Sequence, residues 1–123
     1  MRAIAVITII LGLAAMVFGI LFTTQSVSAK QEVADSIAPL PLAQLDGQYD
    51  LIKTQYDLMR QSGAQPGVEY NYLIAQKVGL GLARSNVGTA NFVMTMGIIN
   101  IIIGLGLVLT GVALLRKIQS GTA

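Results

Sequence analysis

Two long runs without a charged residue constrain this chain more than any other feature. The first lies between Arg2 and Lys30, and the second lies between Arg84 and Arg116. Each contains about 20 or more predominantly apolar residues, enough for a helix to cross the ~30 Å hydrocarbon core of a bilayer. The sequence therefore predicts two transmembrane helices. The predicted segments are a first span at 1–23, an extracytoplasmic segment at 24–91, a second span at 92–117 and a short cytoplasmic tail at 118–123.

The first run has a second interpretation, as a cleavable secretory signal peptide. Arg2 provides a short basic segment before it, and Val27, Ser28 and Ala29 resemble a small-residue cleavage site. The apolar run is nearer ~20 residues than the ~7–15 of a typical signal peptide. We therefore expect an uncleaved anchor, whose helix can continue to about residue 37 because the first proline is Pro39.

Basic residues at the outer ends of the two runs predict the orientation of the chain. Arg2 precedes the first run, and Arg116 and Lys117 follow the second, whereas the segment 24–91 carries five basic and six acidic residues. Lys and Arg near the ends of spans favour the cytoplasmic side. We expect both termini in the cytoplasm, residues 24–91 outside, and the protein in the cytoplasmic (plasma) membrane.

The segment 24–91 has the pattern of a small helical head. An apolar stripe with alternating spacings of four and three residues predicts a helix with one buried seam. The predicted head seam comprises Leu45, Tyr49, Ile52, Tyr56 and Met59.

Prolines and glycines divide this segment into helices. Pro39 and Pro41 precede the stripe, and Gly63, Pro66 and Gly67 follow it. A third helix then starts near residue 68 and continues into the second span. The expected fold class is all-α with three long helices, arranged as a two-transmembrane-helix hairpin with a small extracytoplasmic helical head.

The residue types that most enzymes use for catalysis are scarce. The chain has no Cys and no His, which removes thiolate chemistry, the commonest general base and the commonest transition-metal ligand. Asp46 and Asp50 lie one helical turn apart, but they flank the apolar stripe, where a solvated face is expected. Neither uncharged run contains the acid or base that proton relays need. We expect no catalytic site, cofactor or metal, and a net charge of +2 gives no sign of a nucleic-acid partner.

Small residues recur at intervals of seven on both apolar helices. Lipid provides no hydrophobic drive for helices to associate, so close backbone approach at small residues provides dispersion contacts instead. A seven-residue period predicts left-handed packing. The expected helix-packing interface comprises Gly12, Ala15, Gly19, Ala90, Gly97, Asn100, Gly104 and Gly111.

Asn100 is an amide in the middle of the second apolar run. An unpaired amide in hydrocarbon costs several kcal/mol, so it needs a partner. Antiparallel pairing places it opposite residues 15–18, whose side chains offer none. Two fates remain open, a bond to a backbone carbonyl bared by small residues or a bond to an amide on another chain.

These observations predict a non-enzymatic membrane protein. Its expected role is a structural or accessory subunit of a membrane assembly, with the bilayer and either other membrane subunits or copies of itself as partners. Association would use the small-residue stripes and the exposed head. A homo-oligomeric pore, in which Thr95, Asn100 and Thr110 touch water, is the first alternative. A membrane-anchored extracytoplasmic binding module is the second.

Overall fold

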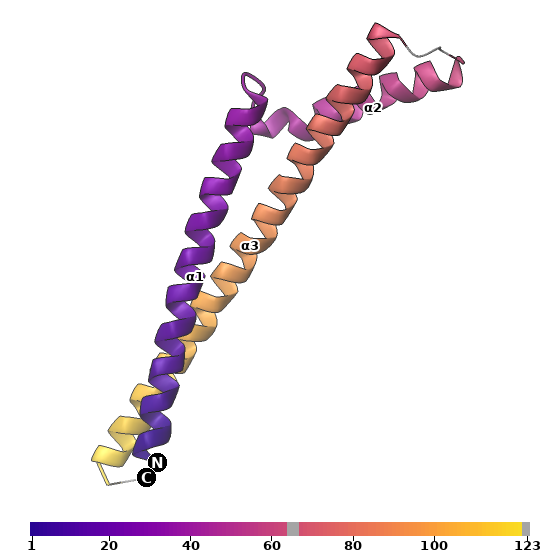
Figure 1. Cartoon of the computed structure of the whole chain (residues 1–123). Coiled ribbons are helices and arrows are strands. Elements are labelled where there is room, and N and C mark those ends of the chain that lie inside the picture. The colour runs from indigo at the N-terminus through magenta and orange to yellow at the C-terminus, as the bar shows by residue number, and fades with distance from the viewer. Residues whose placement is uncertain (64–66, 122–123) are drawn as a thin grey trace. The chain divides into compact units, whose positions relative to one another are not determined.

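The described part of the chain, residues 1–63 and 67–121, is all-helical in the computed structural model, with no strand. Two of its helices are long and apolar enough to cross a membrane. The expectation of an all-α chain with three helices is confirmed. The elements are α1 (Arg2–Ile37), a short 3-10 helix η1 (Leu42–Gln44), α2 (Leu45–Gln61) and α3 (Val68–Gln119) (Figure 1).

Proline and glycine set the helix ends. α1 ends at Ile37, two residues before Pro39, because the residue before a proline is disfavoured in a helix and proline lacks an N–H donor. α2 ends before Gly63, which has a φ of 73° and donates its N–H to the Arg60 carbonyl at 3.2 Å. That left-handed conformation carries little penalty for glycine, so Gly63 closes the helix. Pro66, predicted to separate α2 from α3, lies outside the described residues, as does the end of the predicted tail.

The chain forms two compact units, which are described separately. The first unit contains Met1–Val27 and Asn91–Ala123, and the second contains Ser28–Ala90. In the first unit, α1 and α3 lie side by side and antiparallel, so that the start of α1 and the end of α3 lie together (Figure 1). The second unit contains the rest of both long helices together with η1 and α2.

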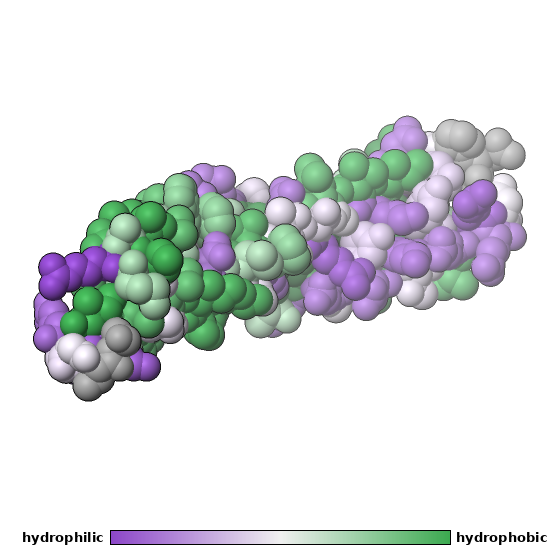
Figure 2. All heavy atoms as spheres, turned by 90° about the horizontal axis from the view of Figure 1, so that it is seen from below, coloured by the Kyte–Doolittle hydropathy of each residue, from purple (hydrophilic) through white to green (hydrophobic). Residues whose placement is uncertain are grey.

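The interior of the first unit consists of small residues, and large apolar side chains lie on the outside. Hydrophobic residues accordingly cover most of this unit's visible surface (Figure 2). This distribution is the reverse of a water-soluble bundle, in which large apolar side chains fill the core. The buried positions repeat every seven residues and are Ala5, Gly12, Gly19 and Ser26 on α1 and Gly97, Gly104 and Gly111 on α3.

The interior of the second unit is an ordinary apolar cluster. Val33 of α1, Leu45 of α2 and Ala83 of α3 are buried together. Ile37 and Leu80 are among the half-buried side chains that pack around them. Three segments that are distant in sequence therefore meet at this cluster, and hydrophilic residues are frequent on the visible surface of this unit (Figure 2).

Candidate functional site

The glycines of the first unit bring two backbones into direct contact. A Cβ atom on Gly12 would lie 2.6 Å from the Gly104 carbonyl oxygen, and one on Gly19 would lie 2.5 Å from the Gly97 carbonyl oxygen. Real Cβ atoms essentially never approach other atoms so closely, so these positions have room for hydrogen alone. The contacting small residues form what we call the glycine seam: Ala5, Gly12 and Gly19 of α1 with Gly97, Gly104 and Gly111 of α3.

Larger side chains close one flank of the glycine seam. Each of them follows a seam residue by four positions, so the heptad has a small residue at one position and a larger partner four residues later. These larger side chains are the ones that an added Cβ on a seam glycine would meet. They are Ile9, Met16 and Thr23 on α1 and Ile101 and Val108 on α3.

The sequence prediction selects the opposite flank, three residues after the small positions. Ala15 and Asn100 lie on that flank and are half-buried, and Ala90 is buried in the second unit. The glycine period alone does not distinguish the two flanks, because residues three and four positions after a glycine lie on either side of it. Apolar character gives no signal for this flank, because the exposed faces of both helices, with Ile10 and Ile102 as examples, are apolar as well.

Threonines of the first unit satisfy their hydroxyl groups on their own helix. Each described threonine of this unit donates to the backbone carbonyl four residues earlier, at distances between 2.8 and 3.0 Å. These bonds offset the cost of placing hydroxyl groups in an apolar environment. The threonines are Thr8, Thr23, Thr24, Thr95 and Thr110.

Asn100 differs from these threonines. Its side chain is half-buried, and it makes no hydrogen bond to any residue in the described part of the chain. In sequence it lies between Gly97, which contacts Gly19, and Gly104, which contacts Gly12. The described chain therefore provides a close helix pair at this level but no partner for the amide.

The predicted head seam includes the buried side chains of α2. Leu45 and Ile52 are 2% and 5% exposed, and Tyr49, Tyr56 and Met59 are half-buried. No member of this set is exposed, although most other residues of α2 are. The seam residues therefore lie on the face of α2 that turns toward the rest of the unit.

Glycine also allows α2 and α3 to approach closely. A ring atom of Tyr49 lies 3.1 Å from where a Cβ on Gly81 would be. A contact this short is tighter than most real Cβ contacts, so an alanine at Gly81 would press on the ring. The Tyr49 ring therefore packs against bare backbone of α3.

Asp46 and Asp50, which lie one helical turn apart, are both ion-pair partners of Arg84. Arg84 Nε lies 3.1 Å from an Asp46 carboxylate oxygen, and its Nη1 lies 3.9 Å from an Asp50 carboxylate oxygen. The guanidinium also lies over the Tyr49 ring, 5.2 Å from its centroid. Both carboxylates are largely exposed, so they do not have the protected environment that acid–base catalysis uses.

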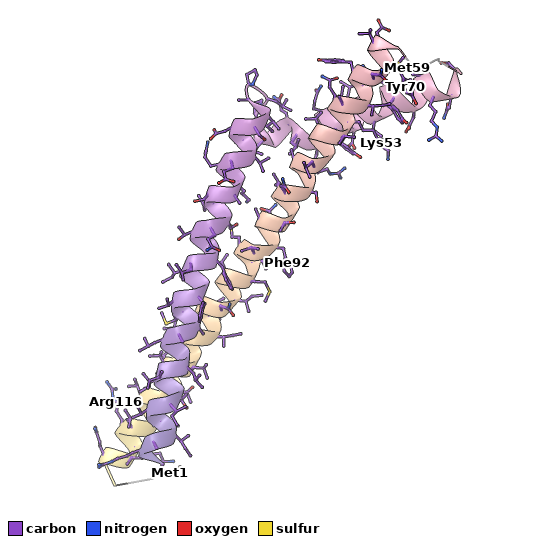
Figure 3. All side chains as sticks on the ribbon, viewed as in Figure 1. Met1, Lys53, Met59, Tyr70, Phe92 and Arg116 are labelled. Carbon is purple, nitrogen blue, oxygen red and sulfur yellow. The ribbon has the colours of Figure 1, made fainter. Side chains whose placement is uncertain are left out.

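A tyrosine pair lies further along the same two helices, between α2 and the first turn of α3, where Figure 3 labels Tyr70. The rings of Tyr56 and Tyr70 have centroids 5.6 Å apart, and the Tyr70 hydroxyl donates to the Tyr56 hydroxyl at 3.5 Å. Lys77 Nζ lies 4.3 Å from the centroid of the Tyr56 ring. The hydrogen bond to Tyr56 raises the pKa of Tyr70 above its ordinary value of 10.0.

An open groove of about 780 Å³ lies in the second unit, between the end of α1, the 38–41 connection, α2 and α3. Its apolar walls include Pro39 and Leu82, and Gln48 and Gln76 contribute amide groups. None of the described residues that line it is charged. Its volume is in the range of ligand pockets, but it has no group that would orient an ionic ligand.

In the described ranges, 1–63 and 67–121, no group of three or more acidic side chains is placed to hold a metal ion. In comparisons with known proteins, no family model, no curated protein and no solved structure matches this chain. The arrangement of its own residues is therefore what supports a functional proposal.

Proposed function

We propose that this protein is a non-enzymatic integral membrane subunit, with two spans formed by the first unit and an extracytoplasmic head formed by the second. One observation carries the proposal: the glycine seam is inside and the large apolar side chains are outside. Phe92 and Ile102, for example, are 66% and 64% exposed. A surface of this kind needs an apolar solvent around it.

The energetics of that outer surface favour lipid over water. Exposed isoleucine, leucine and phenylalanine side chains recur on the first unit, with Ile10, Leu11 and Ile20 as examples. Burying such a side chain away from water is worth roughly 1.5–3 kcal/mol. Lipid provides that environment, and glycine-lined contacts hold helices together where no hydrophobic drive acts between them.

Charge at one end of the first unit supports the proposed orientation. Arg116 lies at the same end as Met1 (Figure 3), and Arg2 and Lys117 are their neighbours in sequence. The segments of the first unit contain no Asp or Glu to offset these positive charges. By the positive-inside rule both termini are cytoplasmic, which gives a cytoplasmic (plasma) membrane protein with residues 24–91 outside.

The role of a structural or accessory subunit puts partner contacts on the head. The seam glycines contact the other long helix of the same chain, so they are already covered. In the second unit, by contrast, Leu51 and Leu58 of α2 are 52% and 61% exposed. These leucines are seven residues apart and therefore lie on one face of the helix. Exposed apolar side chains on one face of a helix are a surface that a partner protein would cover.

Cysteine labelling tests the topology, because the chain has no native Cys. A membrane-impermeant thiol reagent should label Ser62→Cys in intact cells, and it should label Ser120→Cys only after the membrane is opened. Both positions are exposed in the structure, so access to the two side chains is matched. Labelling of Ser120→Cys alone in intact cells would mean that the orientation is opposite to the proposed one. Labelling of both variants would mean that the two positions do not lie on opposite sides of a membrane.

The composition of the particle extracted in mild detergent tests the accessory role. We expect a second kind of subunit in that particle, and we expect Leu58→Glu to release it. Gln55→Glu is the matched control, since Gln55 is also exposed on α2 and is already polar. A particle containing this chain alone would contradict the accessory role, and a current from that particle in planar bilayers would favour the pore.

A further inference from the structure

Asn100 is a polar side chain in the apolar part of the first unit, and the described chain gives its amide no hydrogen-bond partner. The described threonines of this unit each donate to a backbone carbonyl four residues earlier. Within the same described residues, the Asn100 amide makes no such bond. The sequence leaves two partners open for this amide, a backbone carbonyl of the helix pair or an amide on another chain. The first of these bonds is not formed within the described residues.

The position of Asn100 makes an unpaired amide costly. It lies sixteen residues from Arg84 and sixteen from Arg116, at the centre of the second uncharged run. In the predicted span 92–117 it lies eight residues, about 12 Å at 1.5 Å per residue, from the outer end, and therefore within the hydrocarbon. An amide has two N–H donors and a carbonyl acceptor, and leaving all of them unsatisfied there costs free energy.

We propose that a second copy of this chain supplies the missing partner, with Asn100 of one copy hydrogen-bonded to Asn100 of the other. This inference rests on the membrane placement proposed above. A second Asn100 suits this role because each amide has both N–H donors and a carbonyl acceptor, so two identical amides can hydrogen-bond to each other. A two-fold interface brings the same residue of both copies together, which matches this property.

The surroundings of Asn100 on α3 fit such a contact. Met96 and Ile103, one turn before and one turn after it, have exposed side chains, and Ile99 beside it is exposed as well. Apolar side chains around a polar pair exclude water from its hydrogen bonds and add dispersion contacts between the copies. The glycine seam is not needed for this interface, because its contacts lie within one chain.

Energy transfer between labelled copies in lipid vesicles tests the pairing. Donor and acceptor dyes on Ser62→Cys should show transfer that falls as the protein is diluted with lipid. Asn100→Leu should weaken the association constant by about 3- to 30-fold, the range for hydrogen bonds between membrane helices. Asn100→Gln keeps the amide and should retain most of the association. Circular dichroism of each variant should show unchanged helix content.

Disulfide trapping locates the contact directly. Asn100→Cys should cross-link two copies under mild oxidation, whereas Ile102→Cys should not, because Ile102 points about 200° around the helix from Asn100 at roughly 100° per residue. Equal cross-linking at both positions, equal association of Asn100→Leu and wild type, or a wild-type chain that stays monomeric at every dilution would each overturn the proposal. Topology labelling does not depend on association, so a failure here is distinguishable from a failure of membrane placement.

Discussion

Replacing Gly104 by alanine tests whether the glycine seam holds the first unit together. The added Cβ would lie 2.5 Å from the Gly12 carbonyl oxygen and 2.6 Å from Met16 Cγ. Ordinary van der Waals contact begins at 3.4 Å, so the two helices must move apart by roughly 0.9 Å at this level. The shorter contact is with backbone of Gly12, which cannot rotate away as a flexible side chain can.

The cost of this displacement follows from the contacts it weakens. A gap of about 0.5–1 Å forfeits a quarter to a half of a contact worth ~0.1–0.2 kcal/mol, and many atom pairs share the displacement. Overpacking of well-packed interiors costs ~1–3 kcal/mol. Gly106→Ala is the matched control, because nothing lies within 4 Å of its added Cβ. Both substitutions gain the same helix propensity, so the difference between the variants isolates the packing.

The assay is equilibrium separation of α1 and α3 in mixed micelles with increasing SDS. Energy transfer between dyes on Ala3→Cys and Gln119→Cys, both exposed positions, reports the separation. We expect Gly104→Ala to be less stable than Gly106→Ala by about 1–3 kcal/mol. Equal midpoints for the two variants would refute the reasoning, because the seam would then tolerate a methyl group where the structure leaves room for hydrogen alone.

Two further predictions concern the head. Ile52→Asp buries a charge without a partner and should lower the free energy of unfolding by roughly 3 kcal/mol or more. Lys53 is exposed, so Lys53→Asp should change the free energy of unfolding by less than ~0.5 kcal/mol. Urea unfolding in detergent measures both values. Equal tolerance of the two would mean that α2 has no buried seam. The hydrogen bond to Tyr56 raises the pKa of Tyr70 in the folded protein, so Tyr70 ionises more easily in the unfolded chain. The stability that this tyrosine pair contributes should therefore be fully present below pH 10.0 and be lost as the pH rises through the raised pKa. Tyr70→Phe should flatten this alkaline loss, and an unchanged pH profile would exclude Tyr70 as its source.

Local sequence features anticipate most of the helical architecture. Pro39 and Gly63 act through their own backbone chemistry, so the ends of α1 and α2 follow from residue identity. The apolar stripe with spacings of three and four residues likewise predicts that Ile52 is buried, because residues at these spacings share the face of α2 that turns inward. The contact of Arg84 with Asp46 is not anticipated, because residues so distant in sequence meet only once α2 folds back on α3.

Hydropathy and spacing alone specify two uncharged apolar runs with seven-residue glycine periods, because hydropathy and spacing are properties of single residues and of their order. The flank of that period that carries the contacts is decided by packing. Residues three and four positions after a glycine lie on either side of it, and the facing helix selects Met16 and Val108 by where their side chains reach. Packing also decides that Asn100 has no partner within the described chain, because a hydrogen bond needs an acceptor at a particular distance and direction, which a residue pattern does not contain.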